Sequence, residues 1–270
     1  MMNNSTPLST SSLRTGAGGV CLNMIVRDEQ DVIERCLNTV LPCIDSWCIV
    51  DTGSTDRTIE IINRVLRNVP GQVYRLPWTN HFADMRNKAL ELAFRFHDPS
   101  HLMFIDADEE LVGVSNMSFA KNVNQFDACL IPVQHEGKLG NRFWMIRAGY
   151  EGRWTGARHE DMEAVGRVAL AKPGLIMSNQ DSARGKDRYR AIQGDIEVLL
   201  EEIADRPDDP RSWYYLGASY AVAKDWHKAF EAFEKRASME GHPEEKAKAV
   251  AFVESYNRAR AELAHQEVAS

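Results

Sequence analysis

The sequence HLMFIDADEE, residues 101–110, decides the fold that we expect for this chain. Its apolar run, Leu102 to Ile105, has the length of a buried strand. The cluster Asp106-Ala107-Asp108-Glu109-Glu110 follows directly. Open α/β sheets bind ligands beyond the carboxyl ends of their strands, so acidic residues at such an end indicate a ligand site.

The residues before this stretch repeat an alternation of short apolar runs and amphipathic segments. The apolar runs predict strands at 20–26, 47–51 and 72–76, and the amphipathic segments predict helices at 29–41, 57–66 and 83–97. Such alternation is typical of an α/β fold with a mostly parallel sheet flanked by helices. A second acidic cluster, 51–56, follows its strand as 106–110 does, and we expect both at the same edge of the sheet.

The pattern changes after residue 110. Residues 127–134 and 142–148 predict strands that join the sheet in mixed or antiparallel fashion. From about Asp187 the chain is expected to be helical only. Trp213, Leu216, Gly217 and Tyr220 match the tetratricopeptide pattern W-x2-L-G-x2-Y. A single such repeat cannot bury its own faces, so it is expected to pack on flanking helices, and the whole predicts a small all-α tetratricopeptide-like region.

These segments predict three parts of the chain: a disordered N-terminus over 1–19, an α/β domain over 20–180, and the helical region over 187–265. The net charge of −7 argues against affinity for DNA or anionic membranes without regard to sequence. No apolar run has the roughly 20 residues that a membrane span needs. The five cysteines include no CxxC pair, which favours free thiols, and we expect a cytoplasmic protein.

The spacing of Asp106 and Asp108 suggests a metal site. In an extended segment residues i and i+2 point the same way, so both carboxylates can reach one divalent cation. Mg²⁺ or Mn²⁺ prefers oxygen ligands and can bridge to a diphosphate. The alternative is a solvated acidic turn.

Three further groups of residues can carry chemistry. Asp51, just past a strand, can accept hydrogen bonds from a base or a ribose. Arg86, at a helix start, can meet phosphates. In His159-Glu160-Asp161 a histidine next to two carboxylates can supply a metal ligand and a general base. The alternatives are a structural turn, a charged helix face, and a surface turn with a salt-bridged histidine. The basic cluster from Arg184 to Arg190 fits a solvated linker or a phosphate contact.

Taken together, five stretches resemble the family 2 glycosyltransferases of GT-A fold. They are CLNMIVRDEQDVIERCL (21–37), IVDTGSTDRT (49–58), HFADMRNKALELA (81–93), LMFIDADEEL (102–111) and WTGARHE (154–160). The subgroup resembled ends in tetratricopeptide-like helices and includes bacterial and phage enzymes, among them the peptide glycosyltransferase that modifies sublancin. Many members carry two acidic residues where this chain has Asp51-Thr52.

The resemblance implies a GT-A, Rossmann-like catalytic domain, a nucleotide-sugar donor, Mn²⁺ or Mg²⁺, and inversion at the anomeric carbon. By motif, Asp51 would contact the nucleobase, and Asp106 the ribose or the metal. Asp108 would bind the metal and His159 would be a further ligand. The base that deprotonates the acceptor would be Glu160 or Asp161.

The main hypothesis is transfer of a hexose from a UDP-sugar to a hydroxyl or thiol of a protein or peptide. The same chemistry on a modified DNA base or a saccharide remains open, as does the oligomeric state. A second hypothesis is nucleotidyl transfer, against which stands the absence of a Gly-rich basic loop at Arg27 to Gln30. The third is a non-catalytic adaptor that works through its helices.

Overall fold

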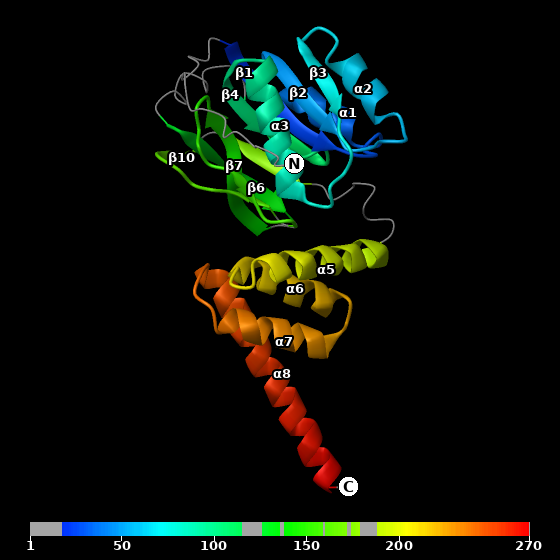
Figure 1. Ribbon diagram of the computed structural model, residues 1–270, viewed down its shortest axis with the longest axis vertical. Coiled ribbons are helices and arrows are strands. Elements are labelled where there is room, and N and C mark those ends of the chain that lie inside the picture. The colour runs from blue at the N-terminus through cyan, green and yellow to red at the C-terminus, as the bar shows by residue number, and fades with distance from the viewer. Residues whose placement is uncertain are drawn as a thin grey trace, which may run out of the picture.

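A computed structural model describes residues 18–114, 126–135, 138–158, 160–171, 174–178 and 188–269. An α/β body lies beside a stack of helices that ends in one long helix (Figure 1). Within the described residues, nine strands form one sheet. They are β1 (Gly18–Val26), β2 (Ser46–Asp51), β3 (Gly71–Arg75), β4 (Pro99–Phe104), β5 (Glu109–Val112), β6 (Ala128–His135), β7 (Lys138–Arg147), β10 (Val168–Leu170) and β11 (Leu175–Ser178).

The order of the strands divides the sheet into a parallel and a mixed half. The order is β3-β2-β1-β4-β7-β6-β11-β5, with β10 also paired to β6. Strands β3, β2, β1 and β4 are parallel, whereas β7 is antiparallel to both β4 and β6. The predicted α/β architecture with later antiparallel additions is therefore confirmed. The short strands β5, β10 and β11 were not predicted, because three or four residues carry little periodic signal.

The helices of the body cover opposite faces of the parallel half. They are α1 (Ile33–Val40), α2 (Thr58–Val65) and α3 (Phe82–Phe96), with a short 3-10 turn at Leu41–Cys43. Strand β1 shows the division: Leu22 and Met24 pack into the cluster with α1 and α2, whereas Cys21 packs with α3. Buried Asn23 faces α3, where its Nδ2 donates to the carbonyl of Ala89 at 3.0 Å. This hydrogen bond ties α3 to the centre of the sheet.

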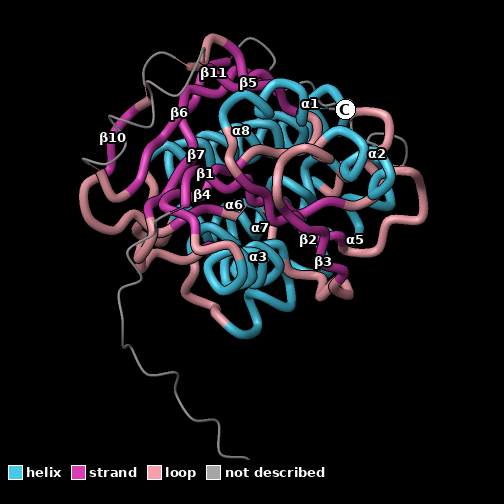
Figure 2. The backbone as a smooth tube through the Cα atoms, turned by 90° about the horizontal axis from the view of Figure 1, so that it is seen from above, coloured by secondary structure: helices cyan, strands magenta, loops and turns pink. Residues whose placement is uncertain are grey.

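The helical region contains α5 (Arg188–Asp205), α6 (Pro210–Val222), α7 (Trp226–Ala237) and α8 (Pro243–Ala269). Figure 1 shows this stack below the α/β body, so the two overlap in the view from above (Figure 2). Gly217 permits the close packing of α6 on α7, since a Cβ atom there would lie 2.8 Å from the ring of Phe233. None of the described helices is both long and apolar enough to span a bilayer. All five cysteines are free and buried, as predicted.

Candidate active site

The acidic stretch after β4 is a turn rather than an extended strand. The amide of Glu109 donates to the carbonyl of Asp106 at 3.1 Å, and β5 begins at Glu109. Asp106 and Asp108 therefore do not lie in the extended segment that their spacing suggested, and that prediction is wrong. The turn instead places Asp106 against basic side chains from two other elements.

Asp106 lies between two arginines. Its Oδ1 accepts from Nη2 of Arg86 on α3 at 2.7 Å, and its Oδ2 accepts from Nη1 of Arg142 on β7 at 3.1 Å. Arg86 also donates from Nε to Oε1 of Glu160 at 2.6 Å, and Arg142 forms an ion pair with buried Glu109. The result is a chain of alternating charges, Glu160, Arg86, Asp106, Arg142 and Glu109, that joins three predicted site residues with two that were not predicted.

Burial and neighbouring charges shift the pKa values of Asp106, Arg86 and Glu109 in opposite directions. Burial would raise the pKa of the Asp106 carboxyl, but the nearby charges of Arg86 and Arg142 outweigh it and hold that pKa well below its usual range. Burial would lower the pKa of Arg86, yet the carboxylates of Asp106 and Glu160 raise it. Burial raises the pKa of Glu109 to about 7, in spite of Arg142. Asp106 and Arg86 therefore remain charged at neutral pH.

The segment 154–158, which leads to Glu160, is fixed by α3. The side chain of Asn87 accepts from the amide of Trp154 at 3.0 Å and donates to its carbonyl at 2.9 Å. The amide of Phe82 donates to the carbonyl of Ala157 at 3.0 Å. The guanidinium of Arg86 lies 4.9 Å from the centre of the Trp154 ring, a cation–π distance. The motifs HFADMRNKA and WTGARHE thus build one site.

Asp51 organises the turn that follows β2. Its carboxylate accepts from the amide of Ser54 at 3.1 Å and from that of Gly53 at 3.3 Å, and the residue is buried. Asp51 therefore has the structural turn role that the sequence left open as an alternative. Asp56 also has a structural role, because it accepts from the amide of Thr58 at 2.9 Å at the start of α2. Asp51 still lies at the end of the parallel strand next to β1, as predicted.

The other predicted site residues are placed as follows. Asp161 is exposed, and it pairs with Thr155 where the strands β8 (Trp154–Thr155) and β9 (Asp161–Met162) meet. Its Oδ1 accepts from the amide of Met162 at 2.9 Å. His159 lies outside the described residues. Of the basic cluster, Arg184 and Lys186 also lie outside them, and Arg188 begins α5.

The described residues alone do not complete a metal site. Both oxygens of Asp106 are taken by guanidinium groups. In the part of the chain that the structure describes, no three His, Cys, Asp or Glu side chains form a group that could hold a metal ion. A cation bound by Asp106 and Asp108 would have to displace an arginine from Asp106, and its third protein ligand would come from elsewhere.

Sequence reasoning missed Arg142, Glu109 and Asn87. Arg142 lies 36 residues beyond Asp106, and the two meet only because β7 inserts beside β4. No local pattern marks this contact. Asn87 had a weak signal, since it follows Arg86 directly on a helix whose opposite face is apolar.

Parts of this chain are similar in sequence to known proteins. Residues 21–150 match the family described as Glycosyl transferase family 2. A TPR repeat-containing protein of Synechococcus elongatus is 32% identical over 242 residues, which cover 83% of this chain and 58% of that protein. The SPbeta prophage-derived glycosyltransferase SunS of Bacillus subtilis is 33% identical over 89 residues, 33% of this chain and 20% of SunS. The chain thus spans less than two thirds of either relative.

The fold has a counterpart among solved structures. A crystal structure of TarS 1-349 of S. aureus in complex with UDP-GlcNAc superposes with a TM-score of 0.52 at 11% identity. The match covers 90% of this chain and 92% of that one. It confirms the predicted GT-A architecture followed by helices.

Proposed function

We propose, on the premise that residues 21–150 belong to glycosyl transferase family 2, that this chain transfers a hexose from a UDP-sugar to a hydroxyl or thiol of a protein or peptide. The observation that carries the proposal is the position of Arg86, whose guanidinium joins Asp106 to Glu160. Arg86 thereby connects Asp106, which we expect to contact the donor, with Glu160, which lies in the segment that we expect to contact the acceptor.

Arg86 and Arg142 suit a nucleoside diphosphate. Guanidinium groups bind phosphate oxygens in a bidentate manner. An entering diphosphate would compete with Asp106 for these two arginines and would stabilise the negative charge that develops on the departing UDP. Asp51, which shapes the turn after β2, is proposed to contact the nucleobase, and Asp106 the ribose or the metal.

Within the pair Glu160 and Asp161 we infer that Asp161 is the general base. Glu160 is engaged by Arg86, whereas Asp161 is exposed. In the proposed step Asp161 takes the proton of the acceptor hydroxyl or thiol. The acceptor oxygen or sulfur then bonds to the anomeric carbon while the bond from that carbon to the phosphate oxygen breaks, and UDP leaves with the electron pair. Attack on the side opposite to UDP inverts the anomeric carbon.

Two features support a polypeptide acceptor. Helices in the tetratricopeptide arrangement form extended binding surfaces. The amide of Ala157, three residues before Glu160, donates to the carboxylate of Glu202 on α5 at 3.0 Å, so the helical region adjoins the acceptor segment. If no peptide is modified, a saccharide or a modified DNA base is the alternative acceptor.

Mn²⁺ or Mg²⁺ remains part of the proposal as a cofactor of the donor. When bound, the ion would neutralise diphosphate charge. Asp106, Asp108 and His159 are the proposed ligands, and this set stays a prediction because His159 lies outside the described residues.

Donor binding tests the proposal. Thermal unfolding is measured with UDP, UDP-glucose and UDP-GlcNAc, each with and without Mn²⁺, and UDP release is followed by chromatography. A ligand present at 100 times its Kd should stabilise the fold by about 2.7 kcal/mol. Release of UDP supports a transferase, whereas release of pyrophosphate from a nucleoside triphosphate and sugar phosphate would support nucleotidyl transfer. No thermal shift with any UDP-sugar would contradict the proposed function.

A further inference from the structure

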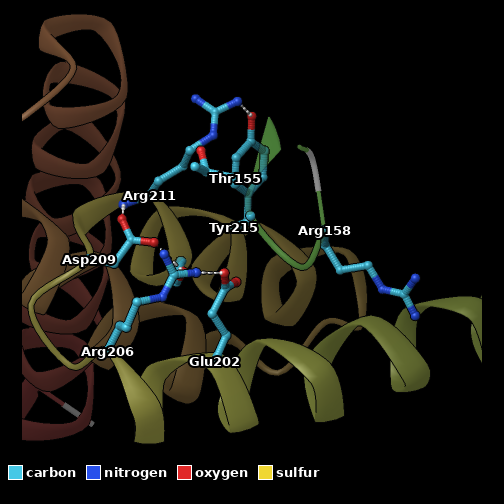
Figure 3. Close-up of a pocket in the computed structure, with 9 residues that line it drawn as sticks. Thr155, Arg158, Glu202, Arg206, Asp209, Arg211 and Tyr215 are labelled. Carbon is cyan, nitrogen blue, oxygen red and sulfur yellow. Dashed lines mark hydrogen bonds and ion pairs between the residues drawn. The ribbon is translucent and has the colours of Figure 1, made fainter. Parts of the chain in front are cut away.

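A cavity of about 160 Å³ lies where segment 155–158 meets α5 and α6 (Figure 3). Thr155 lines it from the α/β body, and Glu202 and Tyr215 line it from the helical region. Thr155 is the strand partner of Asp161, and its Oγ1 lies 3.5 Å from the carbonyl of Asp161. The cavity is thus lined by the strand partner of the proposed base, although Asp161 itself is not in the lining.

Among the described residues, no group hydrogen-bonds to one of the two carboxylate oxygens of Glu202. The side chain rises from α5 toward Arg206, with which it forms an ion pair (Figure 3). Its Oε1 accepts from the amide of Ala157 at 3.0 Å. Its Oε2 is buried, and no other group among the described residues hydrogen-bonds to it. A buried acceptor left unsatisfied is destabilising, so a ligand that brings a hydrogen-bond donor there is favoured.

The charges around the cavity favour a donor over an anion. Each of its three arginines is already ion-paired. The pairs are Arg158 with Asp195 at 2.8 Å, Arg206 with Glu202, and Arg211 with Glu245 at 3.0 Å. Figure 3 also shows the guanidinium of Arg158 turned away from the other lining residues. Of the carboxylates in and next to the cavity, those of Glu202 and Asp209 line it, whereas Asp195 and Glu245 lie outside the lining. An acidic ligand group would meet carboxylates before it met an unpaired cation.

We propose that this cavity is an acceptor subsite that takes one hydrogen-bond-donating side chain of a polypeptide, with Oε2 of Glu202 as its acceptor. A lysine ammonium is the strongest such group, because a charge-assisted hydrogen bond exceeds a neutral one. The proposal rests on the proposed function. Because the cavity is lined by the strand partner of Asp161, a side chain bound in it would belong to a residue within a few positions of the modified residue.

Glu202→Gln tests the role of the free oxygen. Glutamine retains a carbonyl oxygen for the Ala157 amide and places an NH₂ group where Oε2 stood. The full chain is incubated with UDP-glucose or UDP-GlcNAc and with peptides that carry Cys, Ser or Thr at the centre and Lys, Gln, Ala or Glu at each flanking position. Products are quantified by mass spectrometry. The wild type should modify its best Lys peptide at least tenfold faster than the matching Glu peptide, and E202Q should lose most of that ratio.

A matched control separates ligand recognition from support of the loop. Asn87→Ala removes the two hydrogen bonds that hold Trp154 of the same segment, and Asn87 does not line the cavity. This variant should slow all peptides alike and keep the Lys-to-Glu ratio. An acetylated-lysine peptide tested on the wild type gives the same comparison without any mutation, and it should be modified more slowly than the lysine peptide.

The outcomes are distinct. If E202Q slows all peptides equally and keeps the ratio, Glu202 only supports the segment and the subsite proposal is wrong. If the wild type releases UDP but modifies no peptide, the polypeptide acceptor is wrong. If it binds no UDP-sugar, the proposed function itself fails.

Discussion

The Nε atom of Arg86 donates to Oε1 of Glu160 at 2.6 Å, and this contact joins the start of α3 to the residue before β9. The side chain of Arg86 is only 10% exposed and that of Glu160 14%. With Asp106 on its other side, the same guanidinium neutralises two carboxylates. The pair therefore sets the spacing between the proposed donor and acceptor halves of the site.

Replacing Arg86 should damage both stability and activity. Arg86→Met leaves two carboxylates without their shared partner, and breaking a buried pair in this way costs about 3–5 kcal/mol. Arg86→Lys should recover part of the stability, but one ammonium cannot reproduce the two-sided contact. UDP release should stay at least tenfold below wild type in both variants. Urea unfolding followed by circular dichroism gives the stability.

The control for this prediction is Arg95→Met, on the exposed face of the same helix, which should change stability by no more than about 0.5 kcal/mol. If R86M unfolds at the same urea concentration as the wild type, the bridge contributes nothing to the fold.

Much of the fold could be predicted because the periodic spacing of apolar residues indicates strands and helices. The apolar runs of β1, β2 and β4 and the amphipathic faces of α1 to α3 repeat at the spacings of strand and helix. The Trp213 to Tyr220 pattern likewise predicted packed helices, and the structure places Gly217 of this pattern against Phe233 of α7. These features depend on residues within one or two elements of each other.

The candidate site was predicted only in part, because its geometry depends on distant contacts. Arg86 and Glu160 were singled out separately, but nothing in the sequence showed that they pair across 74 residues. Arg142 reaches Asp106 through the insertion of β7, and the turn at 106–109 replaces the extended segment that the spacing of Asp106 and Asp108 suggested. Such contacts arise from topology, which local periodicity does not encode.

Asp108 provides a test of the metal. Asp108→Asn should reduce the Mn²⁺-dependent part of UDP release at least about tenfold, because an amide is a weaker ligand for a hard cation than a carboxylate. The fold should be retained. The measurements are UDP release and the thermal shift with UDP, each against Mn²⁺ concentration. Unchanged Mn²⁺ dependence in D108N would remove Asp108 from the proposed ligand set.

His101 makes stability depend on pH. The residue is buried in β4, and its Nε2 has no hydrogen-bond partner among the described residues. Burial, and then the charge of Arg147, lowers its pKa below the ordinary value of 6.5. The folded chain thus binds fewer protons there than the unfolded chain. The contribution to stability is fully present above pH 6.5 and is lost as the pH falls from 6.5 through the lower folded-state pKa.

His101→Gln should therefore flatten the acid side of the stability profile. Unfolding free energies measured between pH 5 and 8 should fall less steeply toward low pH in H101Q than in the wild type. His227→Gln, at an exposed position on α7, should leave the slope unchanged. Parallel profiles for H101Q and wild type would show that His101 carries no such effect.

Two glycines of the helical region offer opposite outcomes for the same substitution. In Gly217→Ala the new methyl group would lie 2.8 Å from the ring of Phe233, so α6 and α7 must separate or the ring must move. Overpacking of this kind costs about 1–3 kcal/mol. In Gly194→Ala, within α5, no atom lies within 4 Å of the new methyl, and the gain in helix propensity should stabilise by up to about 1 kcal/mol. Urea unfolding should separate the two variants on either side of wild type. If G217A were as stable as G194A, the tetratricopeptide-like contact between α6 and α7 would not have the closeness described above.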